Sequence, residues 1–476
     1  MAGNSVRSAA ATSLWLLVGT ALWLMVGATV ALAEEGGAHF VPPVWTVLPF
    51  VGILLSIALF PLLAPHFWEH HFPKVSAFWL VVAVLCMIVS VPADDHFARI
   101  YAQEFFSTSE EYVSFIILLG SLFVISGGIY ISGNLPGRPA LNTVMLAIGT
   151  LLASLIGTTG AAMLLIRPLI RSNEKRKSQV HLVIFFIFLV CNIGGTLTPI
   201  GDPPIFLGFL QGVPFEWTLR LFPEWAFCGV ILLSIFFAMD TYLYRREGGS
   251  KAPEKISVKI EGGINFLLLL GVVALVILSG TLKFELNPIE SSLGHFSWND
   301  VIRDGGQMAL AVISILITSK AIRRSNNFHY GPIKEVAYLF AGIFTTMIPA
   351  LMLLNARGAE LGITSPVAYF WSTGVLSSFL DNAPTYLTFL AAAMGSFGFE
   401  HAIQMTLDPA AEQVLKGISL GSVFMGANTY IGNGPNFMVK AIAEGAGIKM
   451  PSFFGYMFWS GLILLPLFFV VGVIFL

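Results

Sequence analysis

The chain has 476 residues and a formal net charge of −2 at pH 7, from 25 Lys and Arg against 27 Asp and Glu. Charged residues make up 11% of the chain and apolar residues 56%. A soluble chain could not bury this much apolar surface and still present a polar exterior. The composition therefore excludes an ordinary soluble protein, a disordered chain and a nucleic-acid binder, and it predicts a polytopic α-helical membrane protein.

The N-terminal segment has the features of a secretory signal peptide. Arg7 precedes an apolar stretch over 14–32, and the stretch ends in Ala31-Leu32-Ala33. This order matches a charged region, an apolar region and a small-residue cleavage site. We expect residues 1–33 to be a signal peptide, with an uncleaved N-terminal anchor as the alternative.

Apolar segments long enough to cross a bilayer recur along the rest of the chain. A helical span needs about 20 predominantly apolar residues. Two further segments, 139–170 and 366–394, are broken near their middles, and we interpret each as a re-entrant hairpin. The expected spans are 44–65, 75–93, 111–132, 180–210, 225–243, 263–282, 305–322, 335–354, 417–440 and 452–476.

The distribution of basic residues favours the hairpin interpretation. If the mature chain starts outside, this arrangement places 18 Lys and Arg on the inner side and six on the outer side. Such an excess is typical of the cytoplasmic face of a membrane protein. We therefore expect a multi-pass protein of a bacterial inner membrane.

The two halves of the chain resemble one another. The segment 153–160 aligns with 377–384, and 198–205 aligns with 429–436. The paired spans run in opposite directions in this arrangement, so the pattern predicts an inverted-topology repeat with about five spans and one hairpin in each copy. Such repeats are typical of secondary transporters. The predicted division is a first repeat over 34–244, a cytoplasmic linker over 245–262 and a second repeat over 263–476.

Two spans are interrupted by residues that break helices. Glycine lets backbone approach closely and proline ends a helix, so each span is expected to unwind near the bilayer midplane. Unwound backbone can coordinate a cation through carbonyl oxygens, and half-helix N-termini can hold an anion. The residues that permit these breaks are Gly194, Gly195, Gly201, Pro203 and Pro204 in the first span, and Gly426, Gly432, Gly434 and Pro435 in the second.

Two acids lie where apolar segments are interrupted, one in a broken span and one in a hairpin. Asp202 lies in the first break and Asp381 at the tip of the second hairpin. An ionised carboxylate at membrane depth costs roughly 2.5–3.5 kcal/mol even on insertion scales, so each acid is a candidate site for Na⁺ or H⁺. The alternative is that each caps the half-helix that follows it. Neutral oxygens are expected from Thr196, Thr198, Asn382, Asn428, Thr429, Asn433 and Asn436.

Three motifs resemble those of the ion transporter superfamily. They are the runs 192–204, 377–384 and 431–436, and the closest branches are arsenite-pump membrane subunits, D-type bacterial sodium/proton antiporters and citrate transporters. The resemblance implies homodimers and an elevator-like motion. Relatives often carry a Ser-Asn-Thr tip where this chain has Gly157-Thr158-Thr159-Gly160, which leaves Thr158 and Thr159 as possible ligands there.

The sequence favours a sodium/proton antiporter, because it offers two membrane acids and no basic residue within a span. The alternative is a citrate or di- or tricarboxylate transporter coupled to Na⁺ or H⁺, with arsenite export a third cargo. An enzyme and a channel are disfavoured, since the spans lack a His/Glu cluster and the paired hairpins suit alternating access. The bilayer and a small ion or anion are the expected partners, and no cofactor beyond Na⁺ or H⁺ is expected.

Overall fold

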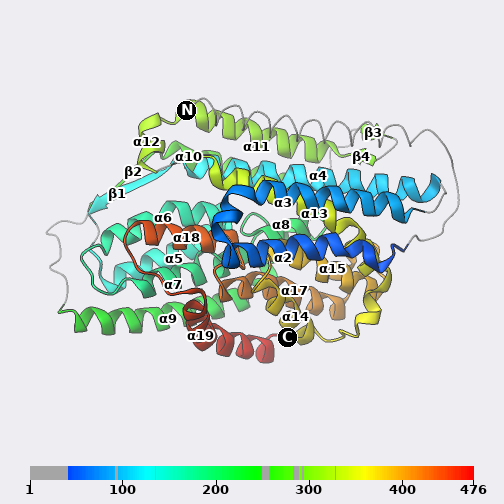
Figure 1. Ribbon diagram of the computed structural model, residues 1–476. Helices are drawn as coiled ribbons and strands as arrows, with labels where there is room; N and C mark the ends of the chain where they lie inside the picture. Colours follow the sequence, from blue (N-terminus) through cyan, green and yellow to red (C-terminus); the bar gives the residue numbers. More distant parts are fainter. Residues whose placement is uncertain are drawn as a thin grey trace.

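The computed structural model describes residues 41–91, 95–134, 136–248, 257–281, 289–291, 294–326 and 328–476. The predicted signal peptide, 1–33, lies outside these residues. The structure is helical almost throughout (Figure 1), and seven of its described helical segments are long and apolar enough to cross a membrane. The prediction of a multi-pass α-helical membrane protein is confirmed.

The described part of the first half of the chain contains eight α-helices, a strand and three short 3₁₀ turns. These elements are η1 Val44–Val47, α2 Leu48–Leu63, α3 Pro65–Ser90, α4 Asp95–Ser126, β1 Tyr130–Asn134, α5 Pro139–Ile156, α6 Thr158–Ser172, α7 Val180–Leu189, η2 Ile193–Thr196, α8 Pro203–Leu210, η3 Phe215–Leu221 and α9 Phe222–Arg246.

The second half follows a similar order. Its elements are β2 Ser257–Glu261, α10 Ile264–Thr281, β3 Ile289–Ser291, β4 Gly294–Phe296, α11 Trp298–Ile317, α12 Lys320–Ser325, α13 Gly331–Arg357, η4 Gly358–Leu361, α14 Pro366–Ser377, α15 Asn382–Phe397, α16 Gln404–Leu407, α17 Pro409–Met425, η5 Gly426–Asn428, α18 Gly434–Gly445 and α19 Phe453–Ile474.

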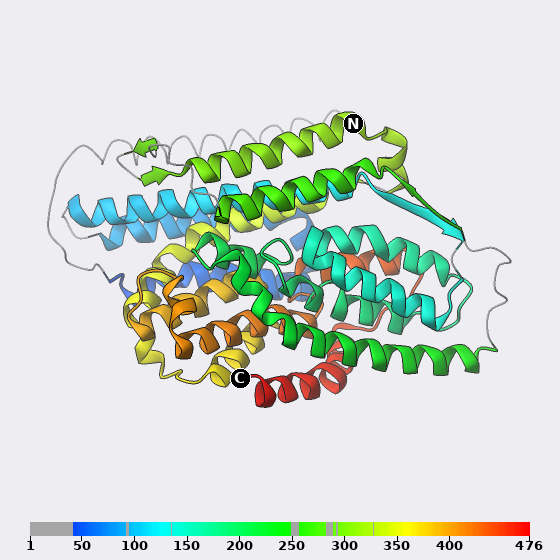
Figure 2. The same cartoon turned by 180° about the vertical axis from the view of Figure 1, so that it is seen from behind.

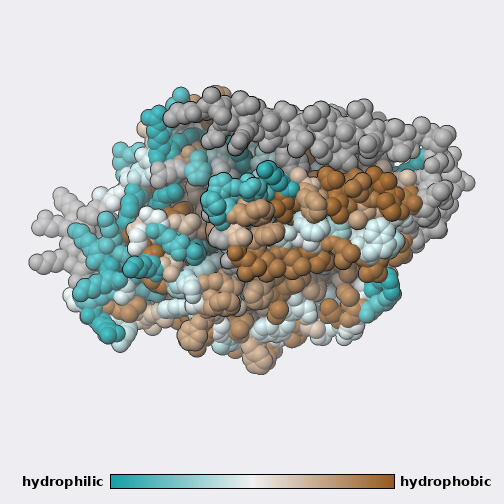
Figure 3. All heavy atoms as spheres, viewed as in Figure 1, coloured by the Kyte–Doolittle hydropathy of each residue, from teal (hydrophilic) through white to brown (hydrophobic). Residues whose placement is uncertain are grey.

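The outward faces of α2 and α3 are apolar, as contact with lipid requires. Large apolar residues recur on each helix at intervals of three or four, so that they share one face. Figure 3 shows this face as a band of hydrophobic surface, with hydrophilic atoms gathered toward the left end. The exposed residues are Leu48, Val51, Leu55 and Leu59 on α2, and Phe78, Val81, Leu85 and Ile88 on α3.

Two helical hairpins enter the molecule from opposite ends. Helices α5 and α6 lie at the left of Figure 1 and α14 and α15 at the right, and the reverse view in Figure 2 shows the same separation. The first hairpin turns at Gly157, whose φ of 80° suits glycine. Each of the two broken segments therefore folds as a pair of helices, and the tips of both pairs point toward the middle of the molecule.

Two helices extend beyond the spans expected from hydropathy. Helix α3 begins at Pro65, ten residues before the expected 75, and α4 begins at Asp95, where the sequence suggested a loop until 111. Part of the extension of α4 makes polar contacts: Ser109 Oγ donates to the Phe105 carbonyl at 2.6 Å, and Tyr101 Oη lies 3.2 Å from Ser90 Oγ on α3. Hydropathy detects the hydrocarbon-crossing part of a helix and misses its polar continuation.

The structure adds two small antiparallel ladders, β1–β2 and β3–β4, to the expected helices. Strand β1 follows α4, and β2 lies in the predicted linker, so the first ladder joins the two halves of the chain. Arg171, near the end of α6, donates to Tyr130 Oη and to the Ile131 carbonyl, both at 2.6 Å. The first hairpin is thereby attached to this ladder.

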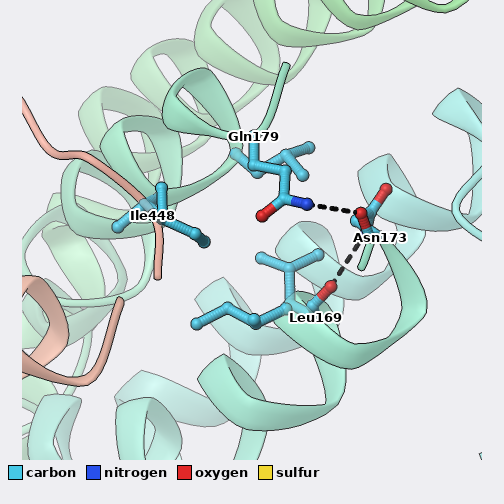
Figure 4. A pocket seen from close by; sticks show the side chains of 7 residues that line it. Leu169, Asn173, Gln179 and Ile448 are labelled. Carbon is cyan, nitrogen blue, oxygen red and sulfur yellow. Dashed lines mark hydrogen bonds between the residues drawn. The ribbon is translucent and has the colours of Figure 1, made fainter. Parts of the chain in front are cut away.

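The open end of the first hairpin is closed by a buried polar network. Asp240 on α9 accepts from Asn142 Nδ2 at 2.8 Å, lies 2.9 Å from His181 Nε2 and pairs with Arg176. Asn173 Nδ2 donates to the Leu169 carbonyl and Gln179 Nε2 to the Asn173 carbonyl (Figure 4). The gap between Leu169, Gln179 and Ile448 has no room for a water molecule. This region is structural support.

The two interrupted helices require glycine where their backbones cross. An added Cβ at Gly201 would lie 2.2 Å from the Gly195 carbonyl oxygen, and one at Gly432 would lie 2.5 Å from that of Gly426. These equivalent contacts show that both breaks have the same construction. Gly434 is also predicted to permit the second break, but a Cβ added to it would meet no atom within 4 Å. Its position is the first residue of α18, with no need for close approach.

We expect Gly432→Ala to destabilise the protein and Gly434→Ala to have little effect. The first change forces a methyl group into backbone, and overpacking typically costs about 1–3 kcal/mol. The measurement is thermal unfolding of both purified variants in the same detergent. Equal melting temperatures for the two variants would contradict the close approach described above.

Candidate functional site

The centre of the site is the carboxylate of Asp202, which is 1% exposed. It lies between the first break and α8, in extended backbone before Pro203 and Pro204. Thr158 Oγ1, at the tip of the first hairpin, donates to Asp202 Oδ1 at 2.9 Å. The Thr158 amide also donates to the Gly201 carbonyl at 2.8 Å, which holds the hairpin tip against the break.

Two amides from the second half of the chain complete the shell around Asp202. Asn382 Nδ2, in the first turn of α15, donates to Asp202 Oδ2, and Asn433 Nδ2, at the start of α18, donates to Oδ1 at 3.2 Å. Both asparagines are buried. One carboxylate thus receives hydrogen bonds from both hairpin tips and from the second break. The structure brings together four of the residues that the sequence predicted, and Asp202 lies at their centre.

Each hairpin is fixed to the neighbouring break by equivalent hydrogen bonds. Thr198 Oγ1 donates to the Ser154 carbonyl, and Thr429 Oγ1 donates to the Ser378 carbonyl at 2.5 Å. Ser154 Oγ donates in turn to the Gly194 carbonyl in the first break, whereas Ser378 Oγ lies 2.8 Å from the Gly374 carbonyl and 3.1 Å from that of Met425, just before the second break. Ser154 and Ser378 align in the two repeats, and this alignment is the signal by which the sequence could have identified them as supports of the site.

The capping alternative is wrong for Asp202 and correct for Asp381. Asp202 precedes α8, but its side chain accepts from none of the amides of that helix. The Asp381 carboxylate accepts from the Ala383 amide at 3.1 Å and so caps α15. Asp381 also lines the central cavity, so capping leaves it available to a ligand.

The remaining predicted residues support the breaks. Thr196 Oγ1 donates to the Ile193 carbonyl at 2.8 Å. Asn428 Nδ2 donates to Ser378 Oγ at 2.9 Å. Asn436 Nδ2 donates to the carbonyls of Gly426 and Thr429, and its Oδ1 accepts from Asn192 Nδ2 at 2.8 Å. These hydrogen bonds hold unwound backbone in place.

A cavity of about 610 Å³ reaches Asp202 and Asp381. Thr158, Thr159 and Asn433 are on its polar side. It extends toward the end of the molecule where α6 finishes and α13 begins, and His329 and Glu335 line it there. Both of these side chains are exposed, so the cavity connects the central acids with solvent at that end.

Arg167 on α6 is a functional candidate that the sequence interpretation missed. Hydropathy and charge place it with the basic residues on the inner side after the hairpin, and they predict no basic residue within a span. In the structure Arg167 lines the same cavity as the two acids, and its Nη1 atom is buried with no hydrogen-bond partner among the described residues. Arg167 follows Thr159 by eight residues, about two helical turns, so the sequence could have placed both on the same helix face.

Comparison with known protein families identifies the chain. A family described as "putative citrate transport", part of the ion transporter superfamily, matches residues 39–476. The chain belongs to this family. It is therefore a membrane protein of a transporter family and not an enzyme. Among curated proteins, none matches the chain.

We expect Thr158→Ala to lower the free energy of unfolding, whereas Thr159→Ala leaves it nearly unchanged. The first change removes a donor from a buried carboxylate, and hydrogen bonds to charged groups contribute roughly 1.5–3 kcal/mol. Thr159 makes no hydrogen bond through its side chain to the described residues.

Denaturant titration of the two purified variants checks this expectation. The adjacent threonine is the matched control, because both changes remove the same atoms from the same helical turn. A larger loss of stability in Thr159→Ala would show that the Asp202 shell does not depend on Thr158.

Proposed function

We propose that this protein is a secondary transporter that moves a small carboxylate across the membrane together with Na⁺ or H⁺. This proposal rests on the lining of the central cavity. Arg167, Asp202 and Asp381 all line it, and Arg167 Nη1 has no hydrogen-bond partner among the described residues. A carboxylate cargo needs a cationic partner, which Arg167 supplies. A coupling cation needs an acid that it can neutralise, which Asp202 or Asp381 supplies.

The surroundings of Asp202 support cation coupling. The Asn382 Oδ1 atom is buried beside this carboxylate and has no hydrogen-bond partner among the described residues. A buried unsatisfied acceptor is costly. A bound Na⁺ would be coordinated by this oxygen and by the carboxylate, and a proton on Asp202 would remove its charge.

The arrangement of the hairpins and breaks supports alternating access through an inverted repeat. The hairpins enter from opposite ends (Figure 1), and equivalent bonds fix each hairpin to its break. Transporters of this construction bind substrate near the midplane at the repeat interface. We extend the proposal to repeats over 34–244 and 263–476, to a homodimer, and to a bacterial inner membrane with the 245–262 linker in the cytoplasm.

Sodium/proton antiport is the second candidate. Asp202, Asp381 and Glu335 line the cavity, whereas Arg167 is the one Lys or Arg among the residues that line it. This excess of acidic side chains favours a cation over an anion. In that case Arg167 would balance one of the acids and contact no cargo.

Transport by the purified protein in liposomes distinguishes the two candidates. Labelled citrate and labelled succinate are offered under an imposed Na⁺ or H⁺ gradient, and a pH dye inside the vesicles reports proton movement. We expect carboxylate uptake that depends on the cation gradient and is lost in Asp381→Asn and Asp202→Asn. Glu360→Gln is the control, since Glu360 is exposed and pairs with Arg357 away from the cavity.

Each result has one interpretation. Dissipation of a proton gradient by NaCl without any carboxylate would assign the antiport activity instead. Gradient-driven uptake that persists in both aspartate variants would contradict the role given to the acids.

A further inference from the structure

One side of the central cavity is a stripe of three α6 side chains with a polar residue at each end. Thr159, Met163 and Arg167 lie at intervals of four residues on α6, and all three line the cavity. At 1.5 Å of rise per residue the stripe is about 12 Å long. It leads from the hairpin tip near Asp202 to the guanidinium of Arg167, with the methionine between them.

The opposite side of the cavity is apolar. It is formed by side chains of α4 and α13, and by Phe206 of α8 at its inner end. Phe115 and Phe340 lie with ring centroids 4.7 Å apart, and Leu119 and Leu339 continue the surface. Apart from Glu335, which lines the cavity at the exposed start of α13, the cavity-lining side chains of α4 and α13 favour contact with carbon atoms.

The charges around the cavity limit how much negative charge a cargo can carry. Arg167 is the single Lys or Arg among the residues that line it, while Asp202, Asp381 and Glu335 are acidic. A trivalent anion would bring two carboxylates that no guanidinium can pair with. Neutralising Asp202 or Asp381 with a coupling cation reduces the repulsion but adds no second guanidinium.

We propose that the cavity binds a carboxylate of low charge that carries an apolar body, in preference to a tricarboxylate. The carboxylate pairs with Arg167, and the body lies between Met163 and the wall that contains Phe115 and Phe340. The inference rests on the proposed carboxylate transport and names the substrate class of that same cavity. A volume of about 610 Å³ accommodates such a cargo, because ligand pockets typically measure roughly 300–1,000 Å³.

Three anions test the proposal by binding to the full-length protein in detergent and by competition for uptake in liposomes. Phenylsuccinate and succinate carry the same charge and differ in the aromatic ring, and citrate carries a third carboxylate. We expect the apparent affinity to fall in the order phenylsuccinate, succinate, citrate. The order is measured on the unaltered protein, so it does not depend on whether a variant folds.

Variants on α6 then separate the two contacts. Arg167→Gln should weaken binding of all three anions by about tenfold or more, as the loss of a charge-assisted contact implies. Arg167→Lys should retain part of the affinity. Met163→Gln should weaken phenylsuccinate and leave succinate unchanged. Lys175→Gln is the matched control, since Lys175 is an exposed basic residue in the turn after α6.

Failure of this inference is distinguishable from failure of the proposed function. If citrate binds most tightly and is taken up, the preference for an apolar body is wrong and carboxylate transport stands. If succinate equals phenylsuccinate, the apolar wall does not contact the cargo, and the inference is again overturned. If none of the three anions binds or competes, carboxylate transport itself is wrong.

Discussion

The structure depends on the burial of one carboxylate. Asp202 is almost completely buried, and the protein surrounds it with a hydroxyl and two amides from three other segments. A buried charge without such partners would be far more costly than the loss of any one contact. The hairpin tips and both breaks must therefore meet at one place, and this requirement fixes how the two halves of the chain are placed relative to each other.

The same requirement explains why the site consists of irregular backbone. Continuous helices would satisfy their own amides and carbonyls and would keep their axes about 8–10 Å apart. The breaks bring Gly195 against Gly201 and Gly426 against Gly432, so that side chains from opposite ends of the molecule can reach the same carboxylate. The unwound carbonyls then need new partners: Ser154 Oγ donates to that of Gly194, and Asn436 Nδ2 donates to those of Gly426 and Thr429. Stability and binding geometry come from one set of residues.

Much of this arrangement could be predicted from the sequence, because its signals are local. Interruptions by Gly and Pro mark the breaks, acids within apolar segments mark the site, and the two internal alignments pair Ser154 with Ser378. Asp202 and Asp381 look alike in sequence. Only the structure shows that Asp381 caps its helix while Asp202 accepts side-chain donors, because the difference depends on three segments far apart in the chain. The sequence also could not identify Arg167 as a residue of the cavity, because hydropathy does not distinguish a basic residue at a helix end from one that faces a cavity.

The β1–β2 ladder has a consequence for how α5–α9 can move. Its five residue pairs bring the chain that leaves α4 beside the chain that returns to α10, so the segment that carries α5–α9 begins and ends at the same ladder. Gly133 and Gly262, with φ of 145° and 77°, lie at this junction, where glycine absorbs rotation most easily. Any displacement of α5–α9 relative to the rest of the molecule would therefore have to bend the chain at this ladder, and Arg171, bonded to Tyr130, would hold the first hairpin to it.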